Sequence, residues 1–467
     1  MITYVSTRGE AGERSFEDVL LAGLAEDGGL FVPTSVPALT PAEIRALRPL
    51  SYPELTARLL APFTAGCFTE AELLALARDA YAGFTHPAIA PLRQLDRDSW
   101  MLELFHGPTL AFKDFAMQLL ARMFDAVLQR RGERVTIVGA TSGDTGAAAV
   151  RAFAGMRQVE LAMLHPHGRV SPVQRRQMTT ETAENVLNLA VDGTFDDCQD
   201  LVKAMFADQR FRDEMRLSGV NSINWARVVA QSVYYVWAGL RLGAPDRSIA
   251  FCVPTGNFGN VYAGWIASRM GLPIERLIVA TNANDILARF FASGTYARGT
   301  VVATQSPSMD IQVASNFERL LLTMEADSPE RVRARMQGFR QSGELRVEPD
   351  AFTRARQLFS GGTAGEAETA ATIARTKRMT GDVVDPHTAV GLAVAERETI
   401  PPGVAAVTLS TAHPAKFPEA VHAACGVTPA LPPSMADLMD RPEHVTPMTN
   451  DLGAVERSIR KRFGAVA

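Results

Sequence analysis

The sequence has little cysteine, and its four cysteines are far apart. They stand at positions 67, 198, 252 and 425 of 467, and no two form a CxxC pair, so neither a zinc site nor a disulfide framework is indicated. No uncharged apolar run approaches the roughly 18 residues that a membrane helix needs. The opening residues, MITYVSTRGE, lack the apolar core of a signal peptide. We therefore expect no metal, no membrane partner and a cytoplasmic location, where thiols stay reduced.

A strong charge of either sign is also missing. The chain carries 51 acidic and 47 basic residues, a formal net charge of -4, which gives no reason to expect nucleic acid as a partner. Hydrophobic residues make up 47% and charged residues 21%, a balance typical of a folded, soluble protein rather than a disordered one. The length exceeds what one hydrophobic core usually serves, so we predict more than one domain.

Two kinds of pattern divide the chain near residue 95. Residues 1–95 are predicted to form a mostly helical N-terminal domain, with helices that follow the N-caps Thr40 and Thr69. From residue 96 to 467, short β-branched runs alternate with amphipathic helices, the order expected of doubly wound, mostly parallel sheets. We predict a large α/β domain, a smaller α/β subdomain nested at about 115–240, and a charged, helical, peripheral elaboration at about 325–375. Ligands of such sheets bind at the carboxyl ends of strands.

One lysine lies in an unusual setting. Lys113 stands between Phe112 and Phe115 in the segment LELFHGPTLAFKDFAMQL, residues 102–119, directly ahead of a helical pattern. Most lysines are exposed and solvated. A lysine among aromatic neighbours either runs its stem along apolar surface to reach water or is kept for chemistry such as Schiff-base formation.

The first glycine-rich loop, GATSGDTG at residues 139–146, follows a predicted strand and precedes a helix. Its glycines let the backbone approach a ligand closely, and Ser142, Asp144 and Thr145 lie near the helix N-terminus, where a carboxylate or phosphate binds well. The loop matches neither GxGxxG nor GxxxxGK[ST], so nucleotide fingerprints do not apply. A structural glycine turn is the alternative.

The second glycine-rich loop, PTGNFGN at residues 254–260, also connects a strand to a helix. Successive backbone amides in such a loop can form an anion-binding nest, and asparagine tolerates left-handed backbone. A tight turn is again the alternative, but the context favours phosphate. The amides belong to Gly256, Asn257, Phe258, Gly259 and Asn260.

Two further polar segments lie ahead of helices or after strands. In NSINWAR, Asn221 and Ser222 precede a helix whose first turn carries Arg227, an arrangement suited to a phosphate dianion or, alternatively, to simple capping. In LSTAHPAKF, Thr411 is expected to point from a strand end into the cleft. His413 in the same loop could act as an acid or base, but a hydrogen-bonded loop histidine is the favoured interpretation.

Two anion cradles, a polar loop and one lysine in an apolar setting are explained together by a phosphate-bearing cofactor that forms a Schiff base. Pyridoxal 5'-phosphate is such a cofactor. Burial lowers the pKa of a lysine from its free value of ~10.4 and so favours the neutral amine that this chemistry requires.

The motifs then resemble one family closely, in order and over nearly the whole chain. The chain resembles the threonine synthase family, pyridoxal-phosphate enzymes of fold type II related to the tryptophan synthase β subunit. It is similar to the longer branch, which has an N-terminal extension and no regulatory domain. The matching segments are TYVSTRG with GLAEDGGLFVP, ELFHGPTLAFKD, GATSGDTG, NSINWARVVAQSVYY, VPTGNFGN, SMDIQVASNFERLL, DPHTAVG and LSTAHPAKFP.

The resemblance implies a role for each motif. Lys113 would carry the cofactor through a Schiff base, the loop from Gly256 to Asn260 would bind its phosphate, and Thr411 would face its pyridine nitrogen. Asp144 would border the cofactor's 3-oxygen, at a position where many fold-type II enzymes carry asparagine. Residues expected to bind the substrate are Ser142 and Thr145 for its carboxylate, and Asn221, Ser222, Arg227 and Lys416 for its phosphate.

The resemblance also implies an activity, conversion of O-phospho-L-homoserine and water to L-threonine and phosphate by a carbon–oxygen lyase. Lys113 would act as base, and the protein would be a monomer or small homo-oligomer. Two alternatives stay open. One is a threonine-synthase-like phospho-lyase that releases phosphate, ammonia and an oxo acid. The other is a non-catalytic ligand-binding α/β protein, against which the lysine argues.

Overall fold

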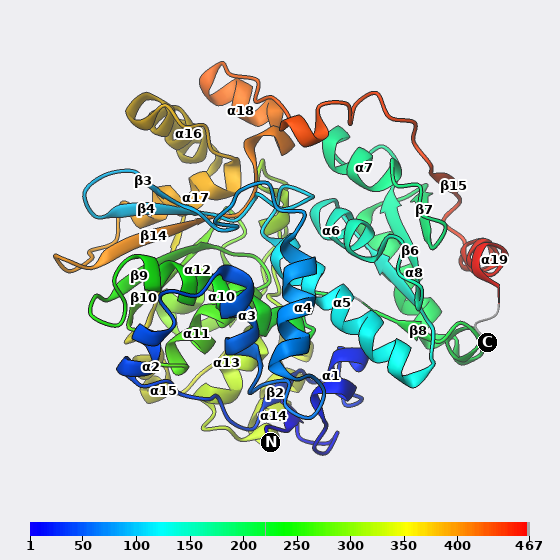
Figure 1. Cartoon of the computed structure of the whole chain (residues 1–467), viewed down its shortest axis with the longest axis horizontal. Helices are drawn as coiled ribbons and strands as arrows, with labels where there is room; N and C mark the ends of the chain where they lie inside the picture. The colour runs from blue at the N-terminus through cyan, green and yellow to red at the C-terminus, as the bar shows by residue number, and fades with distance from the viewer. Residues whose placement is uncertain (220, 465–467) are drawn as a thin grey trace.

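Two mostly parallel sheets, each packed against helices, form the body of the molecule (Figure 1). The computed structural model describes residues 1–219 and 221–464. The last three residues of the predicted catalytic region, 465–467, therefore lie outside the described part. Within that part, no helix is both long and apolar enough to cross a membrane. The predicted α/β fold with mostly parallel sheets is confirmed.

The smaller sheet has the strand order β15-β7-β6-β5-β8, and all its pairs are parallel. Its central strand β6 is buried along its whole length, as expected of a parallel strand covered on both faces. The strands are β5 (Val135–Ala140), β6 (Val159–Pro166), β7 (Val186–Val191), β8 (Leu217–Ser218) and β15 (Thr446–Met448). The helices around it are α5 (Lys113–Arg131), α6 (Asp144–Phe153), α7 (Pro172–Thr179), α8 (Phe195–Ala207), α9 (Gln209–Glu214) and α19 (Leu452–Phe463).

The larger sheet has the order β13-β10-β9-β14-β4-β3, with only the edge strand β3 antiparallel. Its strands are β3 (Leu92–Gln94), β4 (Ser99–Glu103), β9 (Ile249–Pro254), β10 (Ile274–Thr281), β13 (Phe359–Thr363) and β14 (Ala405–Ser410). Its helices are α10 (Trp225–Arg241), α11 (Gly259–Arg269), α12 (Ile286–Ser293), α13 (Phe317–Met324), α16 (Glu366–Thr380), α17 (Pro386–Ala395) and α18 (Pro418–Cys425). Both glycine-rich loops lie at carboxyl ends of strands, the first after β5 and the second after β9.

The N-terminal region is mostly helical, with one short hairpin-like pair of strands. It comprises β1 (Tyr4–Ser6), α1 (Phe16–Ala22), β2 (Phe31–Pro33), α2 (Pro41–Ala46), α3 (Tyr52–Leu60) and α4 (Glu70–Tyr81). The predicted capping boxes at Thr40 and Thr69 are confirmed, since each hydroxyl accepts from the backbone N–H three residues on. The region does not pack separately, because the Tyr52 ring lies 5.6 Å from that of Phe115 and 5.4 Å from that of Trp237.

Part of the segment predicted to be helical and peripheral is a strand of the larger sheet. Helices α14 (Pro329–Ser342) and α15 (Pro349–Arg356) bear out its helical character, beside the small pair β11 (Thr295–Ala297) and β12 (Glu344–Arg346). Strand β13, however, pairs with β10 from Phe359 to Thr363. The prediction was wrong there because FSGGT has two glycines and no alternation of apolar and polar residues to mark a strand.

The C-terminal segment returns to the smaller sheet, a crossing that the sequence did not predict. After α18 the chain passes through the short turn η3 (Pro433–Met435) and adds β15 to the edge strand β7, with Thr446 opposite Leu189. Helix α19 then packs on α8, and Figure 1 shows this red segment beside the smaller sheet. The segment thus ties the two sheets together.

Candidate active site

Lys113 is the first residue of α5 and lies beside the loop that follows β14. A bridge joins the two loops, and the Phe112 N–H donates to the Thr411 carbonyl oxygen at 2.9 Å. Lys113 is 8% exposed, and its Nζ lies 4.9 Å from the centre of the Phe112 ring. Burial lowers the pKa of Lys113 below its ordinary value, and the adjacent Asp144 opposes that shift. The lysine is therefore an interior group rather than one that reaches out to water.

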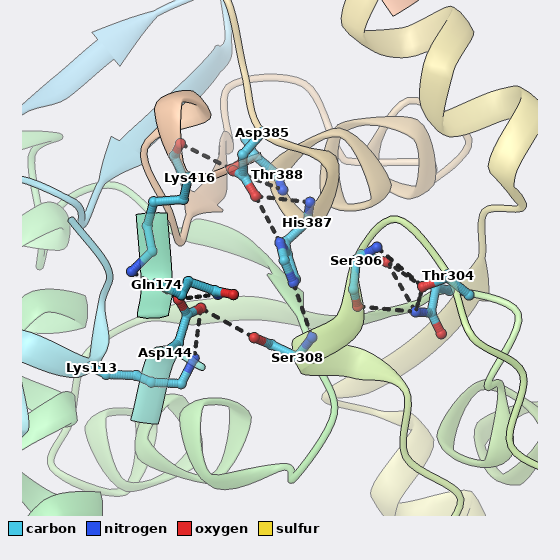
Figure 2. Close-up of polar contacts among 12 residues, drawn as sticks. Lys113, Asp144, Gln174, Thr304, Ser306, Ser308, Asp385, His387, Thr388 and Lys416 are labelled. Atoms are coloured by element: carbon cyan, nitrogen blue, oxygen red, sulfur yellow. Dashed lines mark hydrogen bonds and ion pairs between the residues drawn. The ribbon is translucent and has the colours of Figure 1, made fainter. Parts of the chain in front are cut away.

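Four donors surround the Asp144 carboxylate at the start of α6 (Figure 2). Oδ2 accepts from Lys113 Nζ at 3.2 Å and from Ser308 Oγ at 3.1 Å. Oδ1 accepts from Gln174 Nε2 at 2.7 Å and lies 2.8 Å from Lys416 Nζ. Burial alone would raise the pKa of Asp144, but the charges of Lys416 and Lys113 outweigh burial and hold that pKa well below its ordinary value. Asp144 is thus an ionised link between two lysines.

The loop after β9 has the backbone of an anion cradle. Phe258 has φ +64°, a left-handed conformation that is rare for a bulky side chain and that lets neighbouring amides converge. A Cβ at Gly256 would lie 2.9 Å from the Ser308 carbonyl oxygen, so only glycine fits. Asn260 accepts the Tyr234 hydroxyl at 2.6 Å through Oδ1, and its Nδ2 is buried without a hydrogen-bond partner among the described residues.

Arg227 is a buried cation, two of whose nitrogens have no acceptor among the described residues. It lies in the first turn of α10 and is 3% exposed. Its Nε and one terminal nitrogen make no hydrogen bond within the described part of the chain. Burial lowers the pKa of Arg227 to about 10, so the side chain stays charged at neutral pH. An unpaired buried charge is costly, and it therefore points to an anionic ligand at this place.

These groups line one cavity between the two sheets. Lys113, Asp144 and the loop from Gly256 to Asn260 are among its lining residues. The remaining lining residues are Phe112, Thr145, Ser222, Arg227, Gln231, Pro254, Thr255, Ser308, Met309, His387, Thr411 and Ala412.

The cavity has the features that pyridoxal phosphate requires. It contains a buried amine for a Schiff base, a glycine cradle with an unpartnered amide donor for a phosphate, and a hydroxyl at Thr411. The unpartnered Arg227 leaves room for a second anion in the same cavity. Among the described residues, His, Cys, Asp and Glu side chains form no group of three or more placed to hold a metal ion.

Family models match the chain in three consecutive parts. Residues 3–81 match "Threonine synthase N terminus", residues 85–411 match "Pyridoxal-phosphate dependent enzyme", and residues 388–459 match "Threonine synthase, C-terminal". A threonine synthase of Pseudomonas aeruginosa is 52% identical over 454 residues, which cover 97% of either chain. The chain belongs to the threonine synthase family. The predicted resemblance and the assignment to pyridoxal-phosphate-dependent enzymes are thereby confirmed.

Solved structures of the threonine synthase family have the same fold. A threonine synthase of Brucella melitensis, solved with pyridoxal phosphate bound, is 54% identical and superposes with a TM-score of 0.97 over 99% of both chains. The yeast threonine synthase is 37% identical, with a TM-score of 0.94 over 98% of both chains. The fold-type II architecture that the resemblance implied is therefore present over the full length.

Most of the residues predicted from the threonine synthase motifs line the cavity, but four do not. Ser142 is exposed, and Asn221 is exposed with its Oδ1 accepting from the Ile223 N–H at 3.1 Å. Lys416 is 0% exposed and reaches the site only through Asp144. His413 is half-buried and caps the short turn η2 (Pro414–Lys416) by accepting from Ala415 N–H at 3.1 Å, which agrees with the hydrogen-bonded interpretation. Burial lowers the pKa of His413 to about 4, so it stays neutral.

Five polar residues of the site were not predicted, namely Gln174, Gln231, Thr255, Ser308 and His387. Ser308 and His387 stand in the motifs SMDIQVASNFERLL and DPHTAVG, which carried the resemblance without an assigned role. A histidine next to the N-cap Asp385 at a helix start was the available signal. Gln174 lies in α7, where a polar helix gives no such signal.

Proposed function

We propose that this protein converts O-phospho-L-homoserine and water to L-threonine and phosphate, with pyridoxal phosphate carried on Lys113. The observation that carries this proposal is Arg227, a buried arginine with unpartnered nitrogens in a cavity that already has a glycine cradle for one phosphate. A second phosphate, carried by the substrate, would provide the acceptor for these unpartnered nitrogens. The names of the relatives and the match to the family models support the same reaction.

The cofactor would be held by the groups that face the cavity. Lys113 supplies the amine, and the amides of the loop from Gly256 to Asn260 bind the phosphate. Thr411, which lines the cavity, would offer the pyridine nitrogen a neutral hydroxyl, which would do less than a carboxylate to keep that nitrogen protonated. Bound pyridoxal phosphate supplies an electron sink for the electrons left when a proton departs from the substrate's α-carbon.

The chain's own residues then bind the substrate and move its protons. Thr145, which lines the cavity, binds the substrate carboxylate. The Lys113 amine, whose pKa burial lowers, accepts the proton from the α-carbon. Arg227 and Ser222, which line the cavity, stabilise the charge that grows on the phosphate as its bond to the γ-carbon breaks. A second proton leaves the β-carbon as phosphate departs, and the γ-carbon gains a proton to become the methyl group of threonine. After water has added its hydroxyl at the β-carbon, Lys113 returns a proton to the α-carbon.

The test is one assay of the wild type and Lys113→Ala with O-phosphohomoserine, in which threonine and phosphate are measured together. We expect equal yields from the wild type and no turnover in the variant. Phosphate accompanied by ammonia and an oxo acid would support the phospho-lyase alternative instead. Turnover that persists in Lys113→Ala would overturn the assignment of the lysine.

We further infer a cytoplasmic monomer or small homo-oligomer that acts without nucleic acid or a membrane. Each of the four cysteines, all within the described part of the chain, is free, which supports a reducing compartment. Cell fractionation and light scattering of the purified protein test these two points. Recovery in the membrane fraction or co-purification of nucleic acid would contradict them.

A further inference from the structure

Ser308 joins the Asp144 carboxylate to a buried histidine–aspartate pair. Its hydroxyl donates to Asp144 Oδ2 at 3.1 Å, and its backbone N–H donates to His387 Nε2 at 3.3 Å. His387 Nδ1 in turn lies 2.8 Å from Asp385 Oδ1. Figure 2 shows Ser308 between the histidine ring and the carboxylate. A continuous chain of polar contacts therefore runs from α17 to Lys113.

The contacts of His387 determine which of its ring nitrogens carries the proton. A backbone N–H can only donate, so Nε2 must be the acceptor of the Ser308 N–H. The ring proton therefore lies on Nδ1 and is donated to Asp385, the arrangement by which a carboxylate orients an imidazole. His387 is 3% exposed and packs 4.9 Å from the Phe417 ring, so it has little freedom to turn.

Asp385 is itself held firmly by the helix that it caps. It is fully buried and accepts from the backbone N–H groups of His387 and Thr388 at the start of α17. The Thr388 hydroxyl also donates to it and lies 3.1 Å from Ser410 Oγ at the end of β14. The acceptor that orients the histidine is thus tied to the larger sheet.

The other side of the Ser308 turn is anchored as well. The turn η1 (Pro307–Met309) lies between Ser306 and Asp310. Asn282, which follows β10, donates through Nδ2 to Ser306 Oγ at 2.9 Å and to Asp310 Oδ1 at 2.8 Å. Thr304 adds its hydroxyl to Asp310 Oδ1 at 2.7 Å. The turn is therefore fixed on one side by this network and on the other by His387.

Ser308 is the neutral donor on the carboxylate oxygen that faces the lysine. Asp144 Oδ1 is held by Gln174 and Lys416, whereas Oδ2 receives only the Ser308 hydroxyl and Lys113 among the described residues. Without the hydroxyl, Oδ2 would bind Lys113 alone and could swing with it. The direction in which Asp144 holds the amine then depends on Ser308.

We propose that Asp385 and His387 are positioning residues of this active site, which fix the Ser308 backbone so that its hydroxyl holds Asp144 against the Lys113 amine. The proposal rests on the function proposed above. It assigns His387 a role through Ser308 rather than direct contact with the reacting atoms.

The experiment compares Ser308→Ala, His387→Leu, His387→Gln and the double variant Ser308→Ala/His387→Leu with the wild-type holoenzyme. We expect kcat to fall on the order of tenfold in Ser308→Ala and His387→Leu, the usual size of a lost hydrogen bond to a charged group. KM for O-phosphohomoserine should stay within about threefold, because its phosphate-binding groups are unchanged. His387→Gln should recover most of the loss, since its amide oxygen can accept the Ser308 N–H. The double variant should lose no more than either single one, because the two residues act in series.

A second measurement does not depend on the substrate. The rate at which the apoprotein captures pyridoxal phosphate, followed by absorbance, should fall on the order of tenfold in Ser308→Ala and His387→Leu. Thr369→Val is the matched control, because it removes a buried hydroxyl that donates to the Gly365 carbonyl oxygen at 2.9 Å within α16. It should capture the cofactor at the wild-type rate.

Several outcomes would overturn the proposal. Capture rates and kcat equal to those of Thr369→Val would remove any role for the pair. Full activity in Ser308→Ala with equal loss in His387→Leu and His387→Gln would mean that His387 acts directly on the substrate. Losses that multiply in the double variant would mean that the two residues act independently. If the wild type makes no threonine, the capture rates still decide this inference separately from the proposed reaction.

Discussion

Replacing Arg227 with methionine should stabilise the empty protein while it destroys the enzyme. The side chain is buried, and two of its nitrogens have no partner in the described structure. A buried charge with unpartnered nitrogens destabilises the folded state unless an anion binds beside it. Methionine has a similar length and no charge, so it removes the free-energy cost of the buried charge together with the anion-binding group.

The pKa of the guanidinium sets the size of the effect. Burial lowers the pKa of Arg227 from its ordinary value to about 10, which corresponds to about 3 kcal/mol. Because the folded-state pKa lies below the unfolded one, this cost is present in full below about pH 10 and disappears only as the pH rises above the ordinary pKa of arginine. Allowing for imperfect packing of methionine, we expect a net stabilisation of about 1–3 kcal/mol at pH 7.

The loss of function should be larger. Two charge-assisted hydrogen bonds to a substrate phosphate, at about 1.5–3 kcal/mol each, correspond to a decrease of roughly 10²- to 10⁴-fold in kcat/KM. Phosphate added to the wild-type holoenzyme should also raise its melting temperature by binding the native state. It should leave the melting temperature of Arg227→Met unchanged.

Thermal unfolding of the apoprotein and steady-state kinetics of the holoenzyme test both parts. The matched control is Arg269→Met, which removes an exposed arginine on α11 whose guanidinium lies 5.9 Å from the Trp265 ring. It should change stability by no more than about 0.5 kcal/mol and leave activity intact. An Arg227→Met apoprotein that melts below the wild type, or a holoenzyme variant that still responds to phosphate, would refute the reasoning.

Two further predictions concern the cofactor cradle and the lysine segment. Gly256→Ala should weaken pyridoxal phosphate binding at least about tenfold in an absorbance titration, because its Cβ would meet the Ser308 carbonyl oxygen at 2.9 Å. Gly338→Ala on α14, where an added Cβ meets nothing within 4 Å, should bind normally, and unchanged affinity in Gly256→Ala would count against the cradle. Burial raises the pKa of Asp114 from 3.8 to about 6, so the folded state holds a proton that the unfolded state has lost between those values. The wild type should therefore lose up to about 3 kcal/mol relative to Asp114→Asn as the pH rises from about 4 to 6, and melting temperatures that run parallel over this range would exclude the shift.

The local motifs were predictable because their chemistry is contained in short, continuous segments. The loop from Gly256 to Asn260 needs a strand before it, a helix after it and glycine between them, and all three are visible in sequence. Lys113 stands out for the same reason, since its aromatic neighbours are adjacent in the chain. Ser142 and Asn221 were predicted to bind the substrate, but both side chains are exposed. Side chains along a turn point in different directions, and not all of them can face one cavity.

The strand at Phe359–Thr363 could not be predicted from its local sequence. A strand at the edge of a parallel sheet needs neither alternation nor a turn signal, and two glycines weaken what pattern there is. Only its pairing with β10 makes it a strand. The return of β15 to the smaller sheet is equally a matter of pairing rather than of local sequence.

What the sequence determined by itself is the α/β fold, the family and the groups whose chemistry is local, above all the lysine and the two glycine-rich loops. What the tertiary structure alone decided is how charge is balanced around them. Ser308 lies 164 residues from Asp144 in the chain, and no short-range rule brings the two together. The physical reason is that burial and long-range pairing set the state of a charged group. Within the described structure, two nitrogens of Arg227 lack a partner and Asp144 has four donors because of how distant segments pack.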